Sequence, residues 1–295
     1  MFLKARQIKE AAMIISKIIN VTFSPAGSTR QITAKLAEDI AARLGIPVET
    51  DSFTLPAERT AERQFSFSDL VLFSLPTYAG RIPNKILPFV QTLFSGDSTP
   101  VIPVVTFGNR SYDNSLKELR NELREHGFYP IAAAAVVSRH VFSKTLGNGR
   151  PDRQDLNLLH DFAESIADSI RTAGSVRDLM PPVLPDDDLP VGPYYTPLDE
   201  DGNPAKFLKA VPVTDLGLCD HCGVCSQVCP MGSIPTAHPE ETAGICIKCK
   251  ACILNCPQHA RRFTDPVMLS HTRMLEKNYQ RRASSSFFLP ELRLS

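Results

Sequence analysis

Residues 219–230 read Cys-Asp-His-Cys-Gly-Val-Cys-Ser-Gln-Val-Cys-Pro, and residues 246–257 read Cys-Ile-Lys-Cys-Lys-Ala-Cys-Ile-Leu-Asn-Cys-Pro. Both stretches space their cysteines as C-x2-C-x2-C-x3-C-P, the bacterial pattern for binding two 4Fe–4S clusters. A cuboidal cluster needs four thiolates, and three cysteines separated by two residues can hold three of its irons. All eight cysteines of the chain lie in this block, which predicts eight iron ligands. They are Cys219, Cys222, Cys225, Cys229, Cys246, Cys249, Cys252 and Cys256.

We expect the two runs to exchange one ligand each, because the fourth cysteine of such a run binds the other cluster in two-cluster ferredoxins. Site I then consists of Cys219, Cys222, Cys225 and Cys256. Site II consists of Cys229, Cys246, Cys249 and Cys252. A block this short cannot bury enough apolar surface to fold by itself, so iron–thiolate bonds are expected to supply much of its folding free energy.

Three other uses of eight cysteines fit the spacing less well. A disulfide framework needs an oxidising compartment, and nothing in the sequence directs the chain to one. Zinc sites usually pair two C-x2-C knuckles without a third cysteine two residues later. A degenerate block that holds a single cluster would lack a ligand, and no ligand is missing from this pattern.

Composition narrows the class of protein. The chain has 295 residues, with 32 Lys and Arg against 32 Asp and Glu, so no net positive charge attracts nucleic acid or an anionic membrane. No apolar run reaches the roughly 18 residues that a membrane span needs. The apolar stretch from Ala11 to Phe23 is interrupted by Lys17 and has no small-residue cleavage site, which argues against a signal peptide. We therefore predict a cytoplasmic protein with no nucleic-acid partner and no membrane span.

Residues 1–175 alternate apolar runs with amphipathic segments. The runs at 18–23, 48–53, 70–75, 101–107 and 131–137 predict strands. Helices are predicted at 28–44, 83–94 and 114–126, and Asp152 is expected to cap a fourth. This alternation predicts an α/β fold in which a five-stranded, doubly wound parallel sheet carries helices on both faces.

The rest of the chain divides into three segments. Residues 176–212 contain eight prolines and predict an extended linker. Residues 213–262 form the predicted two-cluster ferredoxin-like α+β domain. Residues 263–295 predict a C-terminal helical tail, in which the segment from Met268 to Tyr279 is amphipathic.

Ligands of doubly wound sheets bind beyond the carboxyl ends of the strands, where three unusual loops follow predicted strands. Residues 24–29, Ser-Pro-Ala-Gly-Ser-Thr, lead straight into a helix and offer hydroxyls, a glycine and free N–H groups, which suit a phosphate. Residues 76–83 place a tyrosine beside Ala-Gly, which suits a planar ring, and residues 106–113 add a second aromatic, Tyr112. Each loop alone also fits an ordinary capped helix or turn. His140, in the loop after the fifth strand, belongs to the same edge and has no assigned role.

At these loops the chain resembles the flavodoxin-like family, whose ligand is FMN. It resembles more closely the EFR1-type fusion, in which a flavodoxin-like domain precedes a bacterial two-cluster ferredoxin domain. The sequence departs from that family at Ala26, where threonine is common, and in lacking tryptophan, so ring stacking would fall to Tyr78 or Tyr112. The FMN contacts that the resemblance implies come from the three loops. They are Ser24, Ala26, Gly27, Ser28, Thr29, Pro76, Thr77, Tyr78, Ala79, Gly80, Phe107, Gly108, Asn109 and Tyr112.

These features predict an electron-transfer protein that passes single electrons between two 4Fe–4S clusters and a bound FMN. The alternative is a ferredoxin-fused, FMN-dependent reductase of a small acceptor such as a quinone or nitro compound, which needs the same cofactors. A third interpretation makes the cluster domain a docking module of a larger complex. No Gly-x-Gly-x-x-Gly fingerprint is present, which argues against direct NAD(P)H binding. The expected partner at the cluster domain is a ferredoxin or another oxidoreductase in an anaerobic setting, and the sequence leaves the oligomeric state open.

Overall fold

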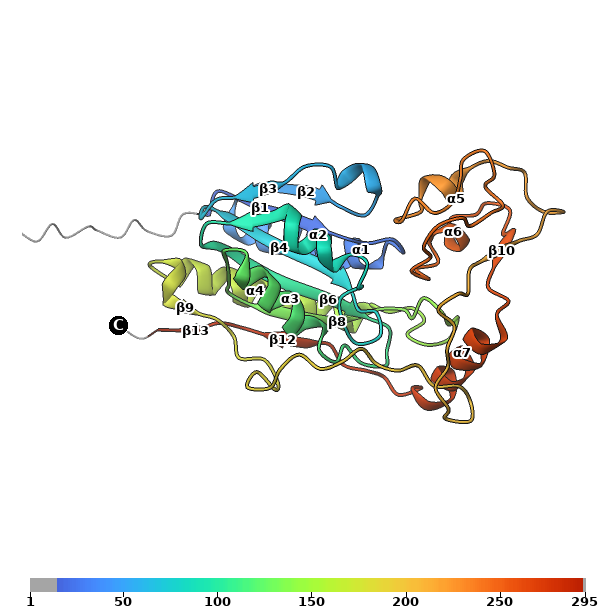
Figure 1. Ribbon diagram of the computed structural model, residues 1–295. Helices are drawn as coiled ribbons and strands as arrows, with labels where there is room; N and C mark the ends of the chain where they lie inside the picture. The colour runs from blue at the N-terminus through green and yellow to red at the C-terminus, as the bar shows by residue number, and fades with distance from the viewer. Residues whose placement is uncertain (1–14, 294–295) are drawn as a thin grey trace, which may run out of the picture.

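The computed structural model describes residues 15–293 of the chain. The sequence argues against a signal peptide in the apolar stretch from Ala11 to Phe23. The part of this stretch before Ile15 lies outside the described residues. Figure 1 shows a sheet flanked by helices and, beyond one edge of it, a smaller part with little regular structure. We call residues 15–175 the sheet domain and residues 213–262 the cysteine domain. Between residues 15 and 293, no helix is long and apolar enough to cross a membrane.

The central sheet carries five parallel strands in the order β2-β1-β4-β6-β8. In that order they span Val48–Ser52, Lys17–Thr22, Asp69–Pro76, Thr99–Phe107 and Ala133–Val137. Counted along the chain, these strands follow the 2-1-3-4-5 order of the flavodoxin-like doubly wound fold. The predicted fold class is therefore confirmed. Two further strands extend the sheet: β7 (Phe128–Pro130) pairs with β6, and β12 (Ser286–Phe288) runs antiparallel to β8.

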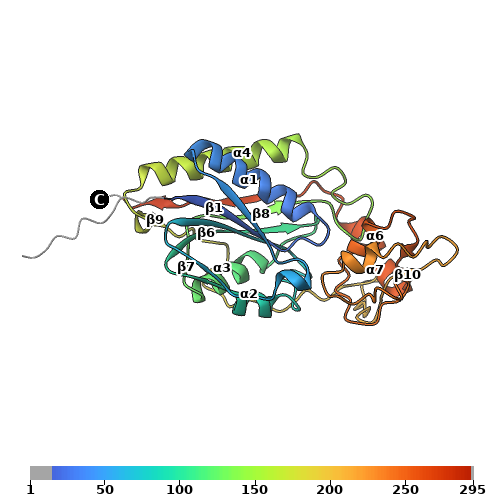
Figure 2. The same ribbon diagram turned by 90° about the horizontal axis from the view of Figure 1, so that it is seen from above.

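Helices cover both faces of this sheet (Figure 2). The helices α1 (Ser28–Leu44) and α4 (Arg153–Thr172) lie on one face. The helices α2 (Leu87–Leu93) and α3 (Ser115–Glu125) lie on the other. Asp152 caps α4, because its carboxylate accepts hydrogen bonds from the first-turn N–H groups.

Successive side chains of a buried strand point to opposite faces of the sheet, so each strand contributes to both hydrophobic cores. Leu70 and Leu72 of β4 join the core beneath α1 and α4, whereas Val71 and Phe73 join the core beneath α2 and α3. The sequence predicts a helix from residue 83, but α2 begins only at Leu87. The chain between Pro83 and Ile86 instead forms a turn, closed by the Ile86 N–H that donates to the Pro83 carbonyl over 2.8 Å.

The cysteine domain is built from short elements. Its two ends are joined by the antiparallel pair β10 (Val213–Thr214) and β11 (Arg261–Arg262). Two one-turn helices, α5 (Val224–Gln227) and α6 (Ala251–Leu254), lie within the first and second halves of the cysteine block. The domain lies beyond the carboxyl ends of the parallel strands, on the side to which their arrowheads point (Figure 1).

Two segments tie the cysteine domain to the sheet domain. The linker lies against the sheet edge, where the Tyr194 hydroxyl donates to the Ile82 carbonyl over 2.8 Å and the Arg110 guanidinium lies 4.0 Å from the Tyr195 ring centre. After the helix α7 (Pro266–Asn278), the tail crosses back and adds β12 to the sheet. There the Phe287 ring packs 4.9 Å from that of Phe162 in α4.

Short elements complete the fold. The tail ends in β13 (Glu291–Leu292), which pairs with β9 (Leu179–Met180). In the sheet domain, β3 (Arg63–Phe65) pairs with β5 (Phe94–Gly96). Single 3-10 turns occur at Pro56–Glu58 and Val176–Asp178.

Candidate cofactor sites

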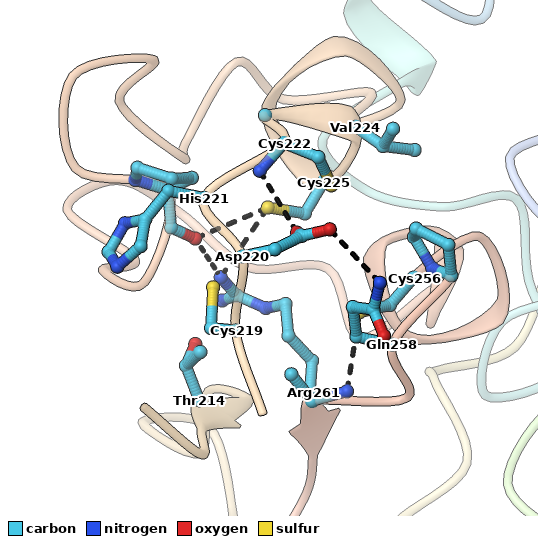
Figure 3. Close-up of a pocket in the computed structure, with 14 residues that line it drawn as sticks. Thr214, Cys219, Asp220, His221, Cys222, Val224, Cys225, Cys256, Gln258 and Arg261 are labelled. Carbon is cyan, nitrogen blue, oxygen red and sulfur yellow. Dashed lines mark hydrogen bonds between the residues drawn. The ribbon is translucent and has the colours of Figure 1, made fainter. Parts of the chain in front are cut away.

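The eight cysteines lie in two pockets of four. Cys219, Cys222, Cys225 and Cys256 line one pocket (Figure 3). Cys229, Cys246, Cys249 and Cys252 line the other. These are the crossed sets of site I and site II, so the fourth cysteine of each run lies with the first three of the other. All eight thiols are free of disulfides.

The two halves of the block repeat the same backbone geometry at an offset of 27 residues. His221 and Lys248, which precede the second cysteine of each run, both have left-handed φ angles, 55° and 61°. Gly223 and Lys250, which follow that cysteine, have φ angles of 73° and 60°. A left-handed lysine or histidine is costly by itself, so both loops hold a strained conformation that curls the chain around its pocket.

Backbone N–H groups point at the sulfurs in corresponding positions. The Ser233 N–H donates to Cys229 Sγ over 3.3 Å, and the Ala260 N–H donates to Cys256 Sγ over 3.3 Å. The Lys248 N–H donates to Cys246 Sγ over 3.4 Å. Such N–H···S bonds stabilise thiolate charge and help to set the reduction potential of a cluster.

The chemistry of the two pockets fits thiolate-bound iron. Burial raises the pKa of Cys249 to about 12 and that of Cys252 to about 11, so these thiols hold their protons unless a cation displaces them. Four cysteines that line one pocket, with N–H donors to Cys256 in site I and to Cys229 and Cys246 in site II, match the four thiolates of a 4Fe–4S cluster. The residues present at each pocket therefore fit such a cluster.

Arg261 is a buried cation that lines the pocket of site I, and no motif in the sequence marks it. Its side chain is only 3% exposed, and its Nη1 lies 3.9 Å from Cys225 Sγ (Figure 3). Its Nη2 donates to the Thr242 hydroxyl over 2.8 Å, while its Nε is buried with no acceptor. The guanidinium also acts on Cys252 of site II, where it opposes the pKa increase that burial causes.

Site II faces the sheet domain. Arg59, from the turn after β2, donates to the Pro230 carbonyl, and Lys250 Nζ donates to the Phe142 carbonyl over 3.0 Å. Met231 and Ile247 pack against the core beneath α2 and α3. The loops that carry the site II cysteines thus form the contact between the two domains.

The first candidate FMN loop, Ser24–Thr29, connects β1 to α1. Gly27 has a φ angle of 86°, and no atom lies within 4 Å of the position of a Cβ there. Gly27 at the N-cap has no side chain to cap α1, and of the first-turn N–H groups only that of Arg30 is bonded to a side chain, so those of Ser28 and Thr29 can meet an anion. The hydroxyls of Ser24 and Thr29 hold the loop itself: the first accepts from the Arg30 N–H over 3.0 Å, and the second lies 2.7 Å from the Thr106 hydroxyl. Ala26 and Ser28 are half-buried at the rim.

The second loop follows β4, whose last residue is Pro76. The Thr77 N–H donates to the Thr106 carbonyl over 2.7 Å, which fixes this loop to the end of the neighbouring β6. Burial raises the pKa of Tyr78 well above its usual value, and negative charge on the sulfurs of Cys249 and Cys246, once a cation has displaced their protons, adds to the shift. The half-buried Tyr78 phenol is therefore close enough to site II to sense its charge. Ala79 is exposed beside it.

Side chains of the third loop, residues 106–113, contact the core and the C-terminal tail. Phe107 is buried at the end of β6, and the Tyr112 ring packs 5.4 Å from it. The Asn109 amide nitrogen donates to the carbonyls of Tyr279 and Arg281, over 2.6 and 2.8 Å. Of the two predicted stacking rings, Tyr78 lies towards site II and Tyr112 lies against the core.

His140 lies beside this loop. A Cβ on Gly108 would come within 2.6 Å of the His140 ring, so the glycine permits the two segments to touch. Burial, together with the charges of His271 and Lys250, lowers the pKa of His140 to about 3. The imidazole is therefore neutral at physiological pH, and its Nδ1 accepts a hydrogen bond from the Phe142 N–H over 3.2 Å.

Replacing Gly80 with alanine is expected to destabilise the protein by about 2 kcal/mol. Gly80 has a φ angle of 77°, and a Cβ there would overlap the Asp113 carboxylate of the third loop. Urea unfolding measures the change. Gly45→Ala is the matched control, because Gly45 has a similar φ of 72° but open space around its Cβ position. An equal decrease in the free energy of unfolding in both variants would show that the second and third loops are not in close contact at Gly80.

Comparison with known proteins gives one match to a family model. Residues 212–234 match the 4Fe-4S binding domain family. A search of curated proteins finds no match.

Several solved structures are similar to part of the chain. A flavodoxin from the domain Archaea is 15% identical with a TM-score of 0.36, covering 52% of this chain and 99% of that one. The flavodoxin of Streptococcus pneumonia TIGR4 is 18% identical with a TM-score of 0.35, covering 50% and 94%. Rubredoxin oxygen:oxidoreductase from the anaerobe Desulfovibrio gigas is 20% identical with a TM-score of 0.36, covering 53% of this chain and 36% of that one.

Proposed function

We propose that this chain is an electron-transfer protein of the EFR1 type, which passes single electrons between two 4Fe–4S clusters and an FMN held by the sheet domain. The observation that carries the proposal is the position of site II. Its loops contact the sheet domain through Met231, Ile247 and Lys250, and the cysteine domain lies beyond the carboxyl ends of the strands, where the three loops are (Figure 1). A cysteine site and a candidate flavin site therefore adjoin.

In this proposal, residues of the chain bind FMN and hold the cysteine domain against the sheet domain. The free N–H groups at the start of α1 would hold the FMN phosphate, with Gly27 leaving room for it. Tyr78 is the residue of the second loop on which charge at site II acts, while hydrogen bonds from Arg59 and Lys250 hold the cysteine domain against the sheet domain. When bound, the clusters supply one-electron chemistry, and FMN supplies one- or two-electron chemistry.

Anaerobic purification tests the cofactor set. We expect a brown-yellow protein with about eight irons and one releasable FMN per chain, since two cubane clusters hold four irons each. A colourless protein loaded with zinc would contradict the proposal.

A panel of small acceptors then separates a carrier from the alternative FMN-dependent reductase. Reduced protein is mixed under anaerobic conditions with quinones and nitro compounds, and their reduction is followed over many turnovers. A carrier is expected to give slow turnover with every small acceptor and faster exchange with a redox protein. Rapid multiple turnover with one small acceptor would favour the reductase.

Replacing Arg261 with glutamine is expected to lower the reduction potentials of both clusters. A unit charge about 4 Å from a sulfur stabilises added negative charge by about 4 kcal/mol at an effective dielectric of about 20. Redox titration followed by EPR measures both potentials. Arg262→Gln is the control, because Arg262 is exposed and pairs with Asp215 over 3.2 Å. Unchanged potentials in Arg261→Gln would show that its charge does not act on the clusters.

A further inference from the structure

The two cysteine sites differ in what surrounds them. Among the eight cysteines only Cys222 of site I is exposed, while Cys225 of the same site is buried. In site II, Cys249 and Cys252 are buried, and the surrounding loops contact the sheet domain. A partner protein therefore reaches a cysteine of site I directly, whereas Met231 and Ile247 beside site II pack against the sheet domain.

Exposed apolar side chains next to site I indicate a docking surface. Just before Cys219, two large apolar side chains are exposed to solvent, Leu216 by 65% and Leu218 by 53%. Isolated exposed leucines are common, but here they flank a redox site that is itself exposed. Apolar contact around a short path to the metal is what a transient redox partner needs.

The charge on this rim is negative. Asp220 lies in the binding loop between Cys219 and Cys222, and its carboxylate is held by Gln258 Nε2 over 3.0 Å. Glu240 lies 3.5 Å from His221 of the same loop, and Glu241 lies beside Glu240. Among residues 15–293, no lysine or arginine forms a salt bridge with these three carboxylates.

The surroundings of site II have the opposite sign. Lys248 and Lys250 both lie in its binding loop, and Arg59 reaches it from the sheet domain. Arg261 also places a buried cation beside Cys225 of site I, so the two sites differ in the sign of their exposed rims and not in having a cation near the sulfurs.

We propose that the face around Cys222, with Leu216, Leu218, Asp220, Glu240 and Glu241, is the port where a one-electron carrier protein with a basic surface exchanges electrons with site I, and that site II is the inner relay. This proposal rests on the proposed function. One electron crosses the port in each encounter: the carrier loses it and the cluster at site I gains it, or the reverse, with no bond made and no proton moved. Charge complementarity selects a basic partner and speeds its encounter.

The test uses two forms of one probe. Cytochrome c is a basic one-electron haem protein, and succinylation of its lysines reverses its charge while keeping its haem. Fully reduced protein is mixed with each form at about 10 mM ionic strength, where screening is weak, and stopped flow gives the second-order rate of haem reduction. We expect native cytochrome c to react at least about tenfold faster than the succinylated form.

The port variant replaces three carboxylates with amides of the same shape: Asp220→Asn, Glu240→Gln and Glu241→Gln. The amide that replaces the Asp220 carboxylate keeps an oxygen that can accept from the Cys222 N–H, as the carboxylate does over 3.2 Å. In this variant the ratio of the two rates is expected to fall towards one. Both forms of cytochrome c take electrons from the same cluster. A change in the potential of this cluster therefore changes both rates of haem reduction and leaves their ratio unchanged.

A control variant removes three exposed carboxylates from the sheet domain: Glu38→Gln, Glu62→Gln and Asp161→Asn. It is expected to keep the ratio of the unsubstituted protein. An equal fall in both variants, or no fall in the port variant, would overturn the docking proposal. Iron, FMN and EPR signals are measured on the same samples, so a protein without clusters refutes the proposed function, and a cluster-loaded protein with an unchanged ratio refutes only the port.

Discussion

The Cys256→Ser variant is expected to lose the cluster of site I, although Cys256 is 31 residues beyond Cys225, the nearest other cysteine of that site. The reason is the crossed arrangement, in which Cys256 lines the pocket of Cys219, Cys222 and Cys225. Cys229→Ser is expected to do the reverse and lose site II, since Cys229 lines the other pocket. In each variant the iron content should fall from about eight to about four, as one cubane is lost.

The two substitutions are matched controls for each other. Cys229 and Cys256 occupy the same position in the repeat, each sulfur accepts an N–H bond over 3.3 Å, and each change removes one thiol. EPR of the reduced protein distinguishes the sites once Cys222→Ser and Cys249→Ser have identified the signal of each. If Cys256→Ser lost the same signal as Cys249→Ser, each run would bind its own cluster and the crossed assignment would be wrong.

The Gly27→Asp variant is expected to be purified with its iron but without FMN. An aspartate at this left-handed position would place a carboxylate in the open space beside the first turn of α1, where the FMN phosphate is proposed to bind. Repulsion between the two anions is about 3 kcal/mol or more at an effective dielectric of about 20, which weakens FMN binding at least about 100-fold. Titration of FMN fluorescence gives the dissociation constant.

Gly27→Asn separates charge from shape. Asparagine is the same size as aspartate and also tolerates the left-handed backbone, but it carries no charge. It is expected to retain measurable FMN binding with the same iron content. Equal affinity in the Asp and Asn variants would show that no phosphate lies at this helix start.

The fold class followed from local patterns that the structure keeps. The apolar run at 70–75 is buried on both faces as the interior of β4, and the segment at 28–44 is α1 to the residue. Such strands and helices are visible in sequence because their apolar residues repeat with the period of the element. Strand β12 could not be found in this way, since it has only three residues and pairs with β8 about 150 residues earlier.

The sequence predicts the cysteines of the two sites but not the charged residues around them. Cysteine spacing indicates a metal block because the ligands themselves form the motif. Arg261 and Arg59 carry no such signal, because a buried cation acts through the three-dimensional position of its charge. Asn109 was predicted as an FMN contact from its loop, yet its amide holds the carbonyls of the tail. The tail's return over this loop is a long-range contact that no local pattern encodes.

The central claim is that electrons pass between the clusters and the flavin within one chain. The direct measurement is anaerobic stopped flow on FMN-loaded protein, in which the clusters are reduced rapidly and flavin bleaching is followed at several protein concentrations. We expect flavin reduction to follow cluster reduction at a rate that does not change over a tenfold range of protein concentration. A rate proportional to protein concentration, or clusters that stay reduced beside an oxidised flavin of higher potential, would contradict the claim.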